Sequence, residues 1–66
     1  MLNMPKPTQI QYREAFDRSS IILETIDRHL IQHPVCKLDK EIAKLIEESA
    51  AKIHEALRLM EDHIDI

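Results

Sequence analysis

The residues best suited to metal chemistry lie together in the segment HLIQHPVC, which contains His29, His33 and Cys36. Two histidines four residues apart share one face of a helix, and a thiolate that follows them could provide a third ligand of a tetrahedral zinc site. Such a site needs a fourth group, however, and Pro34 disfavours helical geometry at His33. We interpret both histidines as solvated residues at a helix end, and we expect no metal and no cofactor.

Residues that could act as nucleophiles have little support around them. A nucleophile needs a base within hydrogen-bonding reach and a site that excludes water. Cys36 has one basic neighbour, Lys37, which favours a thiolate only weakly. Ser19 and Ser49 fall at core-facing positions, where small residues let helices approach closely and their hydroxyls can bond to the preceding turn. A small helical protein also offers little concave space for a substrate, so we expect no enzymatic activity.

The composition excludes several other classes of function. The chain has 66 residues, a formal net charge of −3 and no glycine, so it can form neither a glycine-rich phosphate loop nor a dinucleotide-binding turn. One Tyr, one Phe and no Trp leave no aromatic platform for stacking bases. A single cysteine suits a reducing compartment, and no segment resembles a signal peptide or a membrane span. We expect a soluble cytoplasmic protein without a membrane partner.

An extended arm and a long helix are predicted in the first half of the chain. Residues 1–7 contain two of the three prolines, which favour an extended arm. Thr8 and Gln11 have the spacing of a capping box, the arrangement in which two side chains bond to the backbone at a helix start. Apolar residues then recur at 3–4 spacing until Pro34, which predicts a helix over about residues 9–32.

A second helix follows a short connection. We expect residues 33–38 to form a turn and Asp39 to cap a helix over about residues 40–64. Each helix is then roughly 25 residues long, or about 37 Å at 1.5 Å per residue. Two equal helices with a short turn predict an all-α antiparallel helical hairpin over residues 8–66. Three ion pairs at i,i+4 spacing are expected on its surface: Glu14–Arg18, Glu24–Arg28 and Glu48–Lys52.

The apolar arcs of both helices are too wide for helices that contact only each other. They cover roughly 120° of the first helix and roughly 180° of the second. Arcs of this width suit helices with two neighbours each, as in a four-helix bundle, and a second copy of the chain is the simplest source of the extra neighbour. We therefore predict a homodimeric four-helix bundle. Its expected core contains Phe16, Leu23, Ile26, Leu30, Ile46, Ile53, Leu57 and Met60.

Two aliphatic residues do not fit this pattern. Ile10 and Ile21 project away from the first apolar arc, onto a face that is otherwise mostly charged. Single exposed aliphatic residues are normal on protein surfaces, and the alternative is that they contact a partner. We take Ile10 and Ile21 as candidate contacts for another protein.

The two equal helices, the short turn and the heptad spacing resemble the architecture of the Rop family of plasmid regulators. Members of that family are helical hairpins that dimerise into a four-helix bundle and bind paired RNA loops. The resemblance is confined to architecture, and no RNA-contacting motif matches, so no functional residue carries over. The leading expectation is a non-enzymatic homodimeric module, regulatory or adaptor-like, that binds another protein. The alternative is an RNA-binding regulator that uses the face of the first helix, and either relative orientation of the two hairpins satisfies the sequence.

Overall fold

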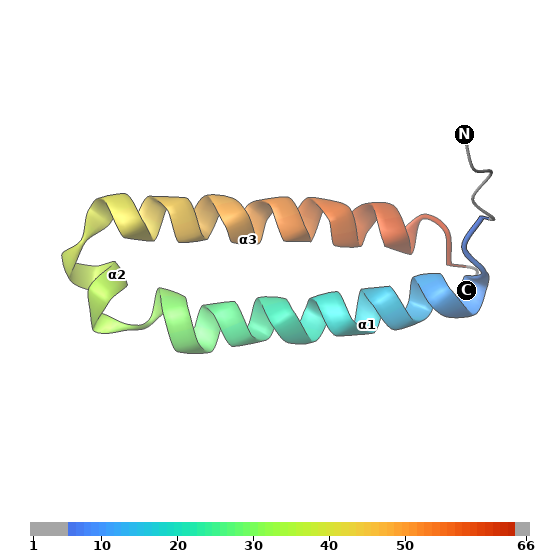
Figure 1. Ribbon diagram of the computed structural model, residues 1–66, viewed down its shortest axis with the longest axis horizontal. Coiled ribbons are helices and arrows are strands. Elements are labelled where there is room, and N and C mark those ends of the chain that lie inside the picture. The colour runs from blue at the N-terminus through green and yellow to red at the C-terminus, as the bar shows by residue number, and fades with distance from the viewer. Residues whose placement is uncertain (1–5, 65–66) are drawn as a thin grey trace, which may run out of the picture.

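The computed structural model describes residues 6–64, and all of its regular elements there are helical. Two long helical segments lie side by side and run in opposite directions, and a short helix joins them at one end (Figure 1). We call the end with the short helix the turn end and the opposite end the open end. The predicted all-α class is confirmed. The elements are α1 (Gln9–Thr25), η1 (Ile26–Ile31), α2 (Pro34–Leu38) and α3 (Lys40–Glu61).

The start of α1 is the predicted capping box. The Thr8 hydroxyl accepts a hydrogen bond from the Gln11 backbone N–H at 3.1 Å, and the Gln11 side-chain oxygen accepts one from the Thr8 N–H at 2.9 Å. Both bonds satisfy backbone donors that have no partner within the helix. Residues 1–5 of the predicted arm lie outside the described residues. Within residues 6–64, no helix has the combination of length and hydropathy that crossing a membrane requires.

The connection between the long segments is more regular than the turn expected over residues 33–38. His33 has the extended backbone that precedes a proline, with ψ at 143°, and Pro34 opens the five-residue helix α2. Proline is favourable at this position because a first-turn N–H has no helical partner to lose. The His33 ring nitrogen Nδ1 also accepts a hydrogen bond from the Val35 N–H at 3.1 Å. His33 therefore caps α2, a role that the sequence did not indicate.

Asp39 separates α2 from α3 and caps α3 as predicted. Its backbone is extended, and its carboxylate accepts a hydrogen bond from the Ile42 N–H at 3.1 Å. The far end of α3 falls at Glu61, before the predicted end near residue 64. There the backbone tightens, because the N–H groups of His63 and Ile64 bond to carbonyls three residues back, at 3.0 Å each.

Removal of the Asp39 cap should destabilise the fold measurably. We expect Asp39→Ala to lower the free energy of unfolding by about 1 kcal/mol, because the Ile42 N–H loses its acceptor. Asp39→Asn is the matched control, since an amide oxygen can accept the same bond. Urea denaturation followed by circular dichroism measures the difference. Equal stability of Asp39→Ala and the parent chain would contradict the role of this cap.

A π-helix, η1, changes which side chain of the first segment faces α3. A π turn contains more residues than an α turn, so the apolar spacing expected from an uninterrupted α-helix shifts. Ile31 is half-buried, whereas Leu30, which the sequence placed in the core, is 46% exposed in the single chain. Four residues of a π-helix cover less than one full turn, so the side chain of Leu30 does not reach the direction of Ile26. It points instead toward the side of the helix on which Ile22 lies.

The contact between α1 and α3 forms a thin core. Leu57 is the only buried hydrophobic residue in the described part of the chain, with 8% of its surface exposed. The Ser19 hydroxyl bonds to the Met60 sulfur at 3.7 Å, not to the preceding turn, so Ser19 of α1 lies beside Met60 of α3. The other predicted core residues besides Leu30 are half-buried between the two segments: Phe16, Leu23, Ile26, Ile46, Ile53 and Met60.

Two of the three predicted ion pairs are present. Arg18 lies 3.5 Å from Glu14, and Arg28 lies 2.9 Å from Glu24. Lys52 pairs with Glu55 at 3.7 Å instead of with the predicted Glu48. All of these side chains are largely exposed, so each pair adds at most a few tenths of a kcal/mol to stability.

Candidate functional site

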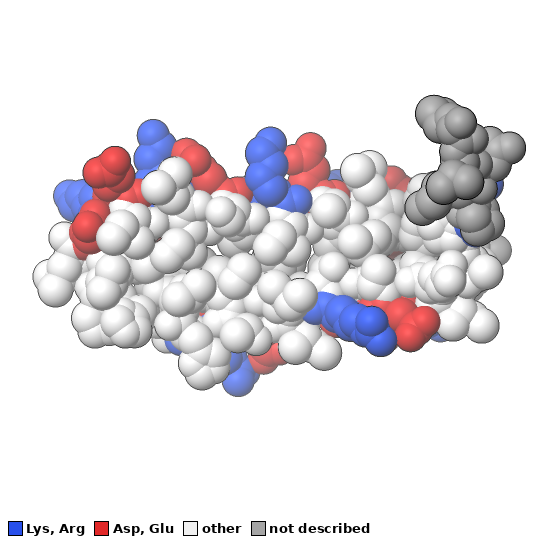
Figure 2. Space-filling view, viewed as in Figure 1, with Lys and Arg blue, Asp and Glu red and all other residues white. Residues whose placement is uncertain are grey.

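The most prominent surface of the helical pair is apolar. Figure 2 shows a broad uncharged area over both long segments, with acidic and basic side chains gathered mainly along the outer edges. Exposed large aliphatic residues contribute to this side of the molecule. We define the apolar face by five of them: Ile22, Leu30, Ile42, Leu45 and Leu59.

The helical spacing places three of these residues, Ile22, Leu45 and Leu59, on one side of the pair. In α1, Ile22 projects about 180° away from Arg13. In α3, Leu45 and Leu59 each project about 160° away from Glu61. Because Arg13 and Glu61 line the same hollow, they mark one side of the pair, and the apolar face occupies the other side.

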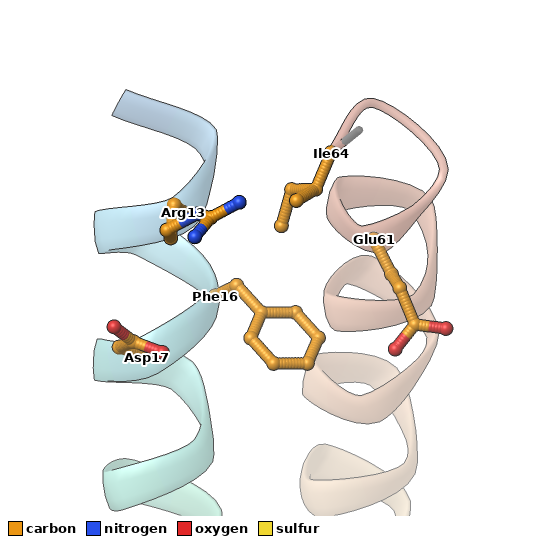
Figure 3. Close-up of a pocket in the computed structure, with 5 residues that line it drawn as sticks. All are labelled: Arg13, Phe16, Asp17, Glu61 and Ile64. Atoms are coloured by element: carbon orange, nitrogen blue, oxygen red, sulfur yellow. The ribbon is translucent and has the colours of Figure 1, made fainter. Parts of the chain in front are cut away.

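The hollow on the opposite side lies between α1 and the end of α3 (Figure 3). It is open to solvent, has a volume of about 530 Å³ and is lined by Arg13, Phe16, Asp17, Glu61 and Ile64. The Phe16 ring extends across the space toward α3, and the charged side chains surround it. None of the five residues is a serine, cysteine or histidine, so the hollow has no nucleophile with a neighbouring imidazole base.

The three residues considered for zinc do not form a site. The His33 Nδ1 atom is occupied as the acceptor that caps α2. Cys36 is half-buried within α2, whereas His29 is exposed on η1. Within residues 6–64, no three His, Cys, Asp or Glu side chains are close enough together to hold a metal ion.

The hydroxyl groups of the helices make hydrogen bonds within the protein. Ser49 donates to the Leu45 carbonyl at 2.9 Å, the predicted bond to the preceding turn, but Ser49 is exposed and does not lie at the core-facing position that the sequence indicated. Ser20 donates to the Phe16 carbonyl at 3.1 Å, and Thr25 donates to a carbonyl four residues back at 2.8 Å. These bonds hold the three hydroxyls against the backbone of their own helices.

The open end contains a contact that the sequence did not predict. The rings of Tyr12 and His63 are stacked with their centres 4.3 Å apart and their planes 5° from parallel. The Gln9 side-chain amide donates a hydrogen bond to the His63 carbonyl at 2.6 Å. Together these contacts hold the chain after α3 against the start of α1. Helical periodicity could not reveal them, because His63 lies beyond the end of α3.

The two candidate partner contacts lie on the outward side of α1. Ile10 is 73% exposed and Ile21 is 63% exposed. They are eleven residues apart, so their side chains point in nearly the same direction, about 16 Å apart along the helix. Since both project away from α3, they belong neither to the core of the helical pair nor to the apolar face.

Comparison with known proteins gives no independent indication of function, because no family model, curated protein or solved structure matches the chain.

Proposed function

We propose that this protein is a non-enzymatic interaction module, regulatory or adaptor-like, that forms a homodimeric four-helix bundle and binds another protein. In the bundle, the apolar faces of two copies cover each other. The outward sides of the four helices stay accessible, and they present Ile10 and Ile21 to the partner.

The surface area of the chain is the observation that carries this proposal. One chain exposes 5960 Å². A compact protein of 7.7 kDa would expose roughly 4300 Å², so the single chain has a large excess of surface. Two copies that close into one compact particle of twice the mass would expose roughly 7200 Å² and bury about 4700 Å² in total. That area lies within the range of obligate homodimers, about 2000–5000 Å² or more.

The shape of the chain also supports a second copy as the occupant of the apolar face. The molecule is only 14 Å thick along its shortest dimension, measured between Cα atoms, so a single layer of two helices cannot enclose a core. A second layer would give every helix two neighbours, as the width of the apolar arcs requires. An identical chain is always present at equal concentration and supplies the same apolar face.

A dimer predicts that stability depends on protein concentration. The melting temperature should rise with concentration, by several degrees between about 1 and 100 μM, because dimer formation draws the unfolded chain into the folded state by mass action. Thermal unfolding by circular dichroism, with light scattering at the same concentrations, tests this directly. A folded monomer of 7.7 kDa at micromolar concentration, with a constant melting temperature, would overturn the proposal.

The partner contacts can be tested separately from the dimer. We expect Ile21→Glu to leave the melting temperature within about 1 °C of the parent, because surface substitutions change stability little. The same substitution should abolish cross-linking to the cellular protein that the parent chain captures. Ala51→Glu, at an exposed position on α3, is the control that should retain capture. Unchanged capture by Ile21→Glu would remove Ile21 from the binding surface.

The RNA-binding alternative is not favoured by any specific contact. Two arginines of the first segment, Arg18 and Arg28, are already paired with glutamates of the same segment. Phosphate binding would require these basic side chains to leave their partners. We therefore retain a protein as the proposed partner.

A further inference from the structure

We infer that the two copies of the dimer pack with their turn ends at the same end of the bundle, an inference that rests on the proposed dimer. Two face-to-face arrangements bring the apolar faces together. In the first, the two-fold axis runs along the helices, the turn ends coincide, and α1 of each copy lies across from α3 of the other. In the second, the axis runs across the helices, the turn ends are opposite, and like helices lie across from each other.

The distribution of the exposed aliphatic residues distinguishes these arrangements. The apolar face is richest near the turn end, because four of its five residues lie between the middle of the molecule and α2: Ile22, Leu30, Ile42 and Leu45. Val35 of α2 itself is also exposed. Only Leu59 belongs to the open half. Coinciding turn ends would therefore place the most apolar parts of the two copies against each other.

With coinciding turn ends, the side chains across the interface match in polarity. The contact between Ser19 and Met60 gives the heights along the pair. On that scale, Leu30 of one copy lies about one helical turn from the level of Leu45 of the other, within the same turn half of the bundle. Arg18 lies nearly level with Leu59. The methylene stem of Arg18 can cover Leu59 while its guanidinium group stays in solvent, as long basic side chains commonly do.

With opposite turn ends, the turn half of each copy lies across from the open half of the other. The open half of the first segment carries the exposed ion pair of Arg18 and Glu14. The opposite arrangement therefore sets the aliphatic surface of the turn half against a more polar half, where the first arrangement sets it against aliphatic surface.

Cys36 provides a direct measurement, because it is the only cysteine of the chain and lies in α2 at the turn end. A nitroxide spin label on Cys36 reports the distance between the two turn ends by pulsed electron paramagnetic resonance. A second variant, Cys36→Ser with Asp62→Cys, carries the label at the open end, where Asp62 is exposed. Circular dichroism establishes that each labelled protein is folded, and light scattering establishes its oligomeric state.

If the turn ends coincide, the distance between the two nitroxides of the dimer is short for both labelled positions. It should not exceed the width of a four-helix bundle, about 20 Å for helix spacings of 8–10 Å, plus the length of the labels. Two long distances in a dimer, at least the length of α3 or about 33 Å for its 22 residues, would overturn the inference in favour of opposite turn ends. A short distance at Cys36 with a long one at Asp62 would also overturn it, since it means overlap of the turn halves alone. A folded monomer without dipolar coupling would overturn the proposed dimer itself.

Discussion

Ile53→Asp is expected to unfold the protein. Ile53 lies half-buried on the side of α3 that faces α1, two turns from the contact between Ser19 and Met60. The substitution removes aliphatic burial worth up to about 1.5–3 kcal/mol and places a carboxylate between the helices without a partner. The total stability of a chain of 66 residues is only roughly 3–10 kcal/mol, and a dimer carries the substitution twice. Circular dichroism at 25 °C should show loss of most of the helical signal.

Ala51→Asp is the matched control for this substitution. Ala51 is exposed on the same helix two residues away, so the same carboxylate there remains in water. We expect it to lower the free energy of unfolding by less than about 1 kcal/mol, the usual range for surface positions. If Ile53→Asp kept the helical signal and melting temperature of the control, then Ile53 could not be part of a core.

The second large effect is expected at a position that is exposed in the single chain. Leu45 and Ile21 are 58% and 63% exposed, so the helical pair alone predicts nearly equal, small effects for Leu45→Glu and Ile21→Glu. The dimer predicts a different result, because Leu45 lies on the apolar face that the second copy covers. Leu45→Glu should weaken dimerisation by at least 100-fold, since two buried leucines are lost per dimer at about 1.5–3 kcal/mol each.

Sedimentation equilibrium measures the dissociation constants of both variants and of the parent chain. At a fixed micromolar concentration, the melting temperature of Leu45→Glu should also fall by more than about 10 °C, because 1 kcal/mol corresponds to about 4–8 °C in a domain of this size. Ile21→Glu should match the parent chain in both measurements. Equal dissociation constants for the two variants would mean that the apolar face is not the dimer interface.

The sequence alone determined the features that depend on neighbouring residues. Thr8 with Gln11, and Asp39 with the backbone of Ile42, form helix caps whose partners are three residues away, so their spacing in the chain suffices to predict them. Pro34 fixes the extended backbone of His33 for an equally local reason. The all-α class follows from the same source, since hydrophobic residues at 3–4 spacing specify a helix and the side of it that is apolar.

The tertiary structure decided the features that depend on how the two segments meet. The π-helix at Ile26–Ile31 exchanges the places of Leu30 and Ile31, because an extra residue in a turn rotates every later side chain relative to α3. The stack of Tyr12 on His63 joins residues at opposite ends of the sequence, and no local pattern encodes it. The sequence likewise predicted apolar arcs wider than a single neighbouring helix would cover. Only the packing of α1 against α3 determines which apolar side chains remain exposed to solvent. The burial of a side chain depends on the residues that contact it, and these come from the other helix.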